Sequence, residues 1–450
     1  MISQNCYSPR RLIDMMRIVA LVVFHCLALA QWQMPAWAQG SGEEVGRVAI
    51  YARNPRYLQD QAGQPMVIIG YGNEVKNSPA VLDQLQGKVN YQRVYAAIWR
   101  YDEAPNAYHW GRPWPTVRGK TDMDAWNETY WRNLRHYIES ARDRSIIVGL
   151  TIWDGHSDLP GGKFGRSSVW NARYNHQGVQ WAYDARALER FPTPRSDGHA
   201  SERLVYYQRR WIDRLISEIR QYPNVIIELD NETDQASENW WLWWAEYFMR
   251  QGDFIIATTW NEHYTISDAT FAQSPLLHMK SYHTRAETVL TPQRLSWNKV
   301  IVVDADNTCS NMDATSARKI AWKSFLNGGH WNDFVCYGKY FPDMVKVQHN
   351  GHLLNFIKTR AVPFAKMDPS AKLASHGTIL VKPGFYYLAY TEKDIELNLS
   401  DAAGFLDYEW YNPRTGIITD SGKVEGGGIR RFQLPVGGDF VLWVHSDNVD

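Results

Sequence analysis

The sequence has no surplus of charge and little cysteine. Lys and Arg total 48 of the 450 residues and Asp and Glu also total 48, so no basic excess points to a nucleic-acid partner. Two of the four cysteines lie in the first forty residues, which leaves Cys309 and Cys336 as a pair. In an exported chain this pair favours a single disulfide, and the alternative is two buried thiols.

Nucleotide-binding and membrane-spanning patterns are also missing. No G-x-G-x-x-G or G-x-x-x-x-G-K-[ST] motif follows a strand, and we expect no cofactor. The apolar run Ile18–Ala30 is shorter than the roughly 20 residues that cross a bilayer. Arginines precede this run and the small-residue site Ala36-Trp37-Ala38 follows it. This order predicts a signal peptide over residues 1–38 and a secreted or periplasmic protein, and a retained membrane anchor is the alternative.

Aromatic residues are abundant. They make up 14% of the chain and include 21 Trp and 25 Tyr, more than the filling of a core usually needs. A flat apolar face with a polar tip suits the face of a sugar ring, which carries C–H groups inside a rim of hydroxyls. The composition therefore favours a carbohydrate ligand, and an aromatic core is the alternative explanation.

From Val48 to about Pro363, short β-branched runs alternate with longer amphipathic stretches, which is typical of an α/β fold with parallel strands. Eight runs over about 300 residues predict a (β/α)8 TIM barrel over residues 39–365, with an open doubly wound sheet as the alternative. The predicted strands are Met66–Gly70, Val94–Ile98, Ile146–Ile152, Val225–Leu229, Phe254–Thr258, Leu277–Ser281, Val300–Val303 and Ser324–Gly329. The clearest helical patterns are Trp126–Ala141, Leu204–Arg220, Trp240–Met249 and Ala314–Phe325.

The pattern changes after Pro363. Short alternating runs separated by glycine-rich turns predict a small antiparallel β-sandwich over residues 370–450. No low-complexity linker separates the two domains, so we expect them to pack tightly. The predicted strands are Thr378–Val381, Phe385–Tyr390, Ile395–Leu399, Tyr408–Tyr411, Arg430–Leu434 and Phe440–Val444.

In a (β/α)8 barrel the active site lies at the carboxyl ends of the strands. The sharpest of these strand ends is Asn224–Glu232, in which an apolar strand runs into the pair Asn231-Glu232. A carboxylic acid can protonate a leaving oxygen, and a neighbouring amide can orient a sugar ring through its 2-hydroxyl. The alternative is that Glu232 caps the helix that follows.

This segment resembles strand four of the large clan of retaining (β/α)8 glycoside hydrolases, often called clan A. The resemblance implies that Glu232 is the general acid/base and that Asn231 binds the sugar 2-hydroxyl. The opening Asn54–Leu58 and the tail Trp410–Gly416 are similar to those of apiosidase-like barrels, which continue into a β-sandwich often labelled collagen-binding. The order of these motifs covers most of the chain after residue 38.

Strand seven departs from the pattern of that clan, which places a nucleophilic Glu there. In Lys299–Asn307, one register puts Asp304 in the nucleophile position, and another puts Ala305 there and leaves no carboxylate. We expect Asp304 or Asp306 to be catalytic and favour Asp304, because it directly follows the last apolar residue of the strand. A retaining mechanism needs about 5–5.5 Å between the two carboxyl groups and an inverting mechanism about 6.5–9.5 Å.

Other strand ends supply candidate sugar-binding residues. Arg93 resembles the strand-two arginine that keeps the nucleophile ionised, and His283 resembles a sugar-contacting His or Tyr. The alternatives are a structural ion pair and a core histidine. The tryptophans are candidate stacking platforms, with core packing as the alternative for each. The full predicted set is Asn231, Arg93, Trp99, Trp153, Asp154, Trp260, His283 and Trp331.

Three functions compete for this sequence. A metal-dependent hydrolase is disfavoured, because segments such as His330–Asp333 lack the ligand spacing of a zinc site, and we expect no metal. A monomeric glycoside hydrolase acting on a polysaccharide or oligosaccharide fits the residues best. A non-catalytic glycan-binding protein on the same fold is the main alternative, because binding and hydrolysis use overlapping residues.

Overall fold

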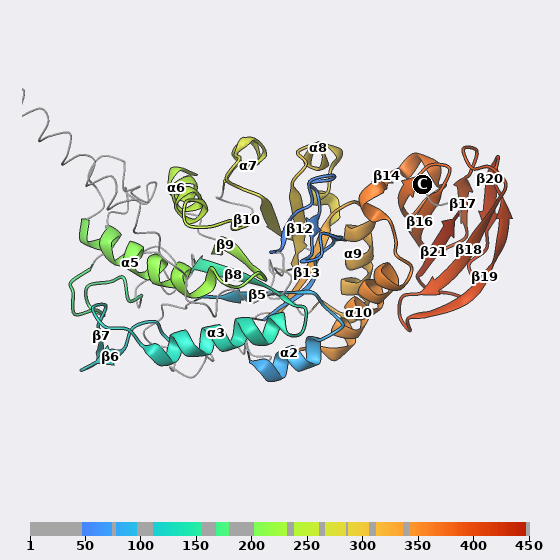
Figure 1. The fold of residues 1–450 in the computed structure, drawn as a ribbon. Coiled ribbons are helices and arrows are strands. Elements are labelled where there is room, and N and C mark those ends of the chain that lie inside the picture. The colour runs from blue at the N-terminus through green and yellow to red at the C-terminus, as the bar shows by residue number, and fades with distance from the viewer. Residues whose placement is uncertain are drawn as a thin grey trace, which may run out of the picture. The chain divides into compact units, whose positions relative to one another are not determined.

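The computed structural model confirms the predicted barrel. It describes residues 47–73, 78–96, 111–154, 168–179, 202–231, 238–260, 266–284, 287–305, 312–335 and 342–446. Eight parallel strands close into a barrel in which each strand pairs with the next along the chain and the last pairs with the first (Figure 1). They are β4 (Ile69–Asn73), β5 (Tyr91–Tyr95), β8 (Ile147–Asp154), β9 (Val225–Asn231), β10 (Ile256–Trp260), β11 (Met279–His283), β12 (Val300–Asp304) and β13 (His330–Val335).

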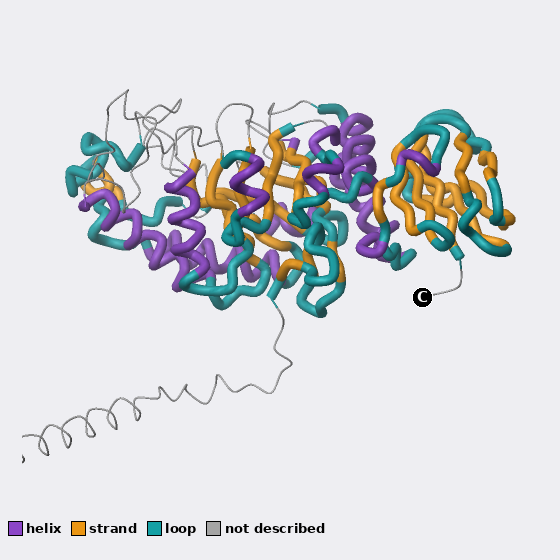
Figure 2. The backbone as a smooth tube through the Cα atoms, turned by 90° about the horizontal axis from the view of Figure 1, so that it is seen from above, coloured by secondary structure: helices purple, strands orange, loops and turns teal. Residues whose placement is uncertain are grey.

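Helices lie outside these strands (Figure 2). Their buried residues recur at helical spacing, as in α5, where Leu204, Tyr207, Trp211 and Leu215 are buried against the barrel. The helices are α2 (Pro79–Leu85), α3 (Glu128–Arg142), α5 (Glu202–Ile219), α6 (Glu238–Met249), α7 (Asp268–Gln273), α8 (Pro292–Leu295), α9 (Ala314–Leu326) and α10 (Met344–Thr359). None of the helices within the described ranges is both long and apolar enough to cross a bilayer.

The barrel strands carry two apolar layers, as the alternation of side chains in a strand requires. In β12, Ile301 and Val303 pack into the large cluster that includes the helices. Val300 and Val302 belong to a separate inner cluster with residues of β9, β10 and β11. The short sheet of β1 (Ala49–Ile50), β2 (Leu58–Gln59) and β3 (Pro65–Met66) contributes Leu58 to this inner cluster. A short hairpin, β6 (Thr116–Val117) and β7 (Lys120–Thr121), follows β5.

The prediction for the eighth strand was wrong. Ser324 lies in the last turn of α9, and Gly328, with a φ of +77°, follows the end of that helix. The strand is β13, six residues further on, and half of its residues are polar. A short apolar run does not distinguish a buried helix face from a strand, which explains the error. Strands β8, β9, β10 and β11 also extend two residues beyond their predicted ends.

The C-terminal residues form the predicted antiparallel sandwich. A six-stranded sheet has the order β14-β15-β16-β21-β18-β19, and the two-stranded β17-β20 shares a core with it through side chains such as Leu397, Phe432 and Leu442. The strands are β14 (Asp368–Pro369), β15 (Thr378–Lys382), β16 (Tyr386–Thr391), β17 (Ile395–Asn398), β18 (Phe405–Asn412), β19 (Ile417–Glu425), β20 (Ile429–Phe432) and β21 (Phe440–His445). The edge strand β19 was not predicted, because nearly all of its side chains are exposed and no apolar alternation marks it.

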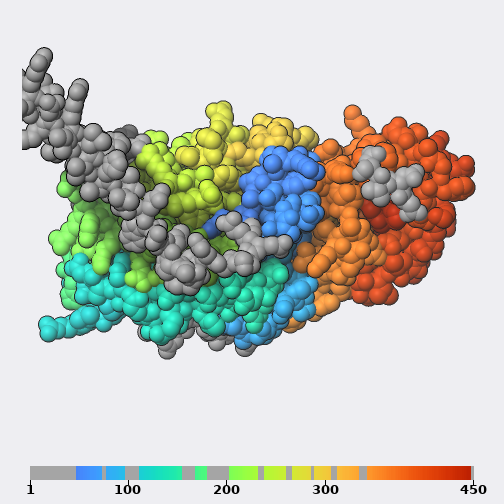
Figure 3. Space-filling model, viewed as in Figure 1, coloured from blue at the N-terminus to red at the C-terminus, as the bar shows by residue number. Residues whose placement is uncertain are grey.

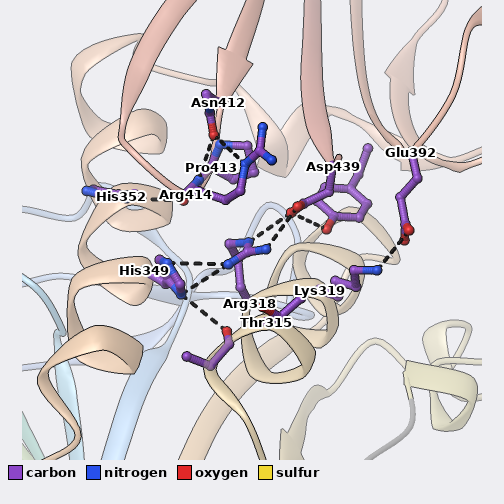
Figure 4. A network of polar contacts seen from close by, with 12 residues as sticks. Thr315, Arg318, Lys319, His349, His352, Glu392, Asn412, Pro413, Arg414 and Asp439 are labelled. Atoms are coloured by element: carbon purple, nitrogen blue, oxygen red, sulfur yellow. Dashed lines mark hydrogen bonds and ion pairs between the residues drawn. The ribbon is translucent and has the colours of Figure 1, made fainter. Parts of the chain in front are cut away.

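The sandwich packs directly on helices α9 and α10, and both belong to one compact unit, Gly46–Asp450. The ring of Trp322 on α9 stacks on Tyr390 of β16 at a centroid distance of 6.5 Å. In the space-filling view the orange helices and the red sandwich are in contact (Figure 3). A polar network, with Arg318 and Asp439 at its centre, crosses the same interface (Figure 4).

Candidate active site

Side chains from strands β5, β9 and β12 meet in the interior of the barrel. These strands are not neighbours in the barrel, so contacts among their side chains place those side chains inside it. The contacts centre on Arg93 of β5, whose side chain has no exposed surface. Its Nε lies 2.7 Å from Oε2 of Glu228, and its Nη2 donates to Oδ1 of Asn231 at 2.7 Å. Its Nη1 lies 3.6 Å from Oδ2 of Asp304 on β12.

Asp304 is held from both neighbouring strands. The register aligns His283 of β11, Asp304 and Asn332 of β13 in one row across the barrel wall. Asn332 donates from Nδ2 to Oδ1 of Asp304 at 3.3 Å, and Nε2 of His283 lies 3.9 Å from Oδ2. All three side chains are buried. The structure therefore brings together Arg93, Asn231, His283 and Asp304 from the predicted set.

A second pair extends this cluster along β8. Asp154 and Asn231 are register partners, and Asn231 donates from Nδ2 to Oδ1 of Asp154 at 3.0 Å. The neighbouring Asp230 is held differently, by the backbone N–H of Thr259 and by the hydroxyls of Thr258 and Thr259. We therefore assign Asp230 a structural role, in which it ties β9 to β10.

Two of the predicted stacking tryptophans lie in the core. The ring of Trp153 packs against those of Trp211, Trp240 and Trp244 on helices α5 and α6, at centroid distances of 5.2 to 5.6 Å, and has no exposed surface. Trp331 is equally buried in the same apolar cluster. The packing alternative therefore accounts for both residues. The physical reason is that both side chains lie on the outer face of the barrel, where the apolar indole packs against the helices and is removed from water.

Several predicted site residues lie outside the described residues: Glu232, Asp306, Trp99, the side chain of Trp260, and the cysteines Cys309 and Cys336. The predictions for these side chains remain predictions.

The residues that support the cluster were not predicted from the sequence. Glu228 is fully buried in the middle of β9 and also accepts a hydrogen bond from the hydroxyl of Thr151 at 3.1 Å. Tyr91 donates its hydroxyl to Oε1 of Glu228. Burial and the neighbouring carboxylate raise the pKa of Tyr91 well above its ordinary value, so the hydroxyl stays protonated and acts as a donor. One signal was available, because a carboxylate inside an otherwise apolar strand requires buried partners.

Two glycines make room for the Tyr91 ring. A Cβ at Gly149 of β8 would lie 1.9 Å from the Tyr91 hydroxyl oxygen, and one at Gly70 of β4 would lie 2.8 Å from its ring and 2.4 Å from Oδ1 of Asn332. Both positions therefore exclude any side chain. Glycines on the two strands that flank β5 therefore leave the space that the Tyr91 side chain occupies.

The histidine of strand eight is structural. Nδ1 of His330 accepts from the backbone N–H of Ile68 at 2.8 Å, and Nε2 lies 2.8 Å from the carbonyl oxygen of Arg56. Full burial lowers the pKa of His330 to about 4, so it is neutral and both of its nitrogens are engaged. Across the described ranges, no cluster of three His, Cys, Asp or Glu side chains has the arrangement of a metal site.

Comparisons with known proteins agree with this architecture. One solved structure with the same fold is described as "Glycoside hydrolase", with a TM-score of 0.63 and 13% identity over 90% of this chain and 98% of that chain. Another is a glycoside hydrolase family 5 protein from Bacteroides vulgatus, with a TM-score of 0.61 and 14% identity over 90% and 93% of the two chains. At these identities the likeness establishes the fold.

The C-terminal sandwich matches a sequence family. Residues 374–445 match the family described as "Putative collagen-binding domain of a collagenase". These residues include every strand of the sandwich except β14. No curated protein matches the chain.

Proposed function

We propose that the protein is a glycoside hydrolase that cleaves O-glycosidic bonds of a polysaccharide or oligosaccharide. The observation that carries the proposal is the position of Arg93, whose guanidinium faces Asn231 at the end of strand β9 and Asp304 at the end of β12. Asn231 is followed in the sequence by Glu232, which supplies the first carboxylate of this proposal, and Asp304 supplies the second. A pair of carboxyl groups on either side of a scissile bond is what glycoside hydrolysis requires. The solved glycoside hydrolases that share the fold support the same reaction class.

Each residue has a role in this proposal. Glu232 donates the proton to the leaving oxygen, and Asn231, held by Arg93 and Asp154, orients the sugar through its 2-hydroxyl. Asp304 is the second carboxylate, either as nucleophile or as the base that activates a water. Arg93 lies 3.6 Å from Asp304 and favours its ionised form, and Nε2 of His283 lies 3.9 Å from the same carboxylate. Trp99, Trp260 and Asp306 are proposed to line the sugar-binding site.

The test is an assay of the full chain on aryl glycosides and polysaccharides. Glu232→Gln keeps the shape of the side chain without the acidic proton, so turnover should fall by about 10²–10⁴-fold. Asp304→Asn should cause a comparable loss and Asp306→Asn a smaller one. The anomeric configuration of the first product, followed by NMR, separates a retaining from an inverting reaction. Full activity in Glu232→Gln would remove that residue from the mechanism.

A matched control is Glu218→Gln on α5. Glu218 is also a buried carboxylate paired with arginines, here Arg135 and Arg214, but it lies on the outer helix layer. The Glu218→Gln variant should be less stable than the wild type and should keep the wild-type turnover per folded molecule. Glycan binding without turnover by the wild-type protein would instead support the non-catalytic alternative.

We also propose that the protein is exported after removal of residues 1–38. Mass spectrometry of the mature protein should place its N-terminus near Gln39, and an intact N-terminus would contradict the proposal. Peptide mapping without reduction tests the disulfide between Cys309 and Cys336, and two free thiols would refute it.

A further inference from the structure

We propose that Glu228 is a positioning residue that acts through Arg93 to set the placement of Asn231 and Asp304. The proposal rests on the function proposed above and concerns how its two catalytic strand ends are held in place. Glu228 would touch no substrate, because its side chain is fully buried beneath the cluster.

Glu228 binds Nε of the guanidinium and is itself held by two further hydrogen bonds. Oε2 lies 2.7 Å from Nε of Arg93 and accepts from the hydroxyl of Thr151 at 3.1 Å, while Oε1 accepts from Tyr91. Every one of these partners is buried. A guanidinium is planar and rigid, so fixing Nε also fixes the directions in which both terminal nitrogens point.

The directions imposed on Arg93 matter for the proposed reaction. One terminal nitrogen reaches Asn231 at 2.7 Å, and the other stops 3.6 Å from Asp304. A guanidinium released from Glu228 would be drawn to Asp304, because a two-pronged Arg–carboxylate pair is the strongest arrangement that both groups can form. Glu228 therefore keeps Asp304 near a positive charge and out of a closed ion pair, while Asn231 stays in place.

The surroundings of Glu228 point to function more than to stability. A buried ion pair is often no more stabilising than apolar residues of similar volume. Here the pair also requires Gly70 and Gly149 to lack side chains so that Tyr91 can reach Glu228. Each interior glycine weakens its strand. An arrangement that lowers strand stability at two positions to support one carboxylate is typical of a site that must be preorganised.

The test measures the titration of Asp304 directly. Among the described residues, the charged or titratable groups near Asp304 include Arg93, His283 and the Tyr91 hydroxyl, and the amide of Asn332 also contacts it. With carboxyl-¹³C aspartate, NMR follows the Asp304 signal, which is assigned by its loss in Asp304→Asn. In Glu228→Gln the midpoint should fall by about one pH unit or more, because Arg93 is no longer neutralised by Glu228 and turns toward Asp304. On any glycoside that the wild type cleaves, kcat should fall about 10²-fold with a smaller change in KM.

Two further variants make the outcome decisive. Glu228→Asp keeps the negative charge on a side chain that is one methylene shorter, so the midpoint of the Asp304 titration should fall less than in Glu228→Gln. If Glu228→Gln does not fold, an unchanged midpoint in folded Glu228→Asp overturns the proposal. Glu218→Gln removes a comparably buried carboxylate from two arginines on α5 and should leave the Asp304 midpoint unchanged. An equal shift in that control would also overturn the proposal. Absence of turnover in the wild type would count against the proposed reaction alone, because the titration needs no substrate.

Discussion

The barrel interior and the interface with the sandwich each contain a buried arginine, a carboxylate and a tyrosine. In the interior, Tyr91 donates to Glu228, which holds Arg93 by Nε alone. At the interface, Tyr390 donates to Asp439 at 2.7 Å, but Asp439 binds both Nε and Nη2 of Arg318, at 2.8 and 2.9 Å (Figure 4). Both clusters combine an arginine, a carboxylate and a tyrosine, and they differ in how many guanidinium nitrogens the carboxylate binds.

This difference separates a structural cluster from a candidate functional one. At the interface the carboxylate takes a whole edge of the guanidinium, and the remaining nitrogen lies 3.3 Å from the ring of His349, so the group serves to join α9 to the sandwich. In the interior the carboxylate takes one nitrogen and leaves two for Asn231 and Asp304. A guanidinium that contacts a different group with each nitrogen, as Arg93 does, can position several groups at once. A guanidinium with two nitrogens on one carboxylate, as in Arg318, mainly joins those two residues.

The largest expected effect tests the structural cluster. Asp439→Ala leaves Arg318 buried without its carboxylate, which should lower the free energy of unfolding by about 3–5 kcal/mol. Chemical denaturation measures the change, and turnover per folded molecule should stay at the wild-type value. Glu392→Ala is the control at the same interface. It breaks a half-exposed pair with Lys319 and should cost less than about 1 kcal/mol. Equal losses of unfolding free energy in Asp439→Ala and Glu392→Ala would contradict the structural role assigned to the Arg318–Asp439 pair.

The next effect concerns a buried polar group that belongs to neither cluster. The folded pKa of His330 is about 4, below its ordinary 6.5, mainly because of burial. Between these values the unfolded chain binds a proton that the folded chain does not, so stability present above pH 6.5 is lost as the pH falls toward 4. The difference of 2.5 pH units corresponds to about 3 kcal/mol.

The variant His330→Gln checks this dependence. A glutamine can accept from Ile68 and donate to Arg56 without taking up a proton. The slope of unfolding free energy against pH should therefore flatten between pH 6.5 and 4, although His278, whose pKa is also about 4, still contributes. An unchanged slope would show that His330 is not the group that titrates.

The strands and helices of the barrel could largely be predicted, because their apolar periodicity reflects burial against the helices. The error at Ser324–Gly329 arose because the apolar end of α9 has the same short apolar pattern as a strand. Strand β13 was not recognised, because inward-facing polar residues such as Asn332 interrupt its apolar pattern. Asp304 and Asn231 could be found because they end apolar strands. Glu228 carried one signal, a carboxylate inside an apolar strand, but Tyr91 and the two glycines carried none, because their roles depend on contacts between strands that are far apart in the sequence.

A third prediction targets the glycine that admits Tyr91. In Gly149→Ala the new methyl group would overlap the Tyr91 hydroxyl, which is confined by Glu228. Overpacking of this kind should cost about 1–3 kcal/mol of stability and should also reduce turnover, because Tyr91 and Glu228 must shift. Gly437→Ala is the matched control, since a Cβ there meets open space. A Gly149→Ala variant that is destabilised but keeps full turnover would show that the position of Tyr91 does not affect catalysis.

The last prediction removes a single atom from each of the two clusters. Tyr91→Phe and Tyr390→Phe each remove one hydroxyl that donates to a buried carboxylate and leave the ring in place. Burial and the adjacent carboxylate raise the pKa of both tyrosines, so each variant loses a true donor. Each should lower the free energy of unfolding by about 1–3 kcal/mol, the cost of leaving a buried carboxylate oxygen without its donor. Only Tyr91→Phe should also lower kcat, because Glu228 then holds Arg93 less firmly, whereas Asp439 still binds Arg318 through two hydrogen bonds. An unchanged kcat in Tyr91→Phe would show that the interior cluster is as purely structural as the one at the interface.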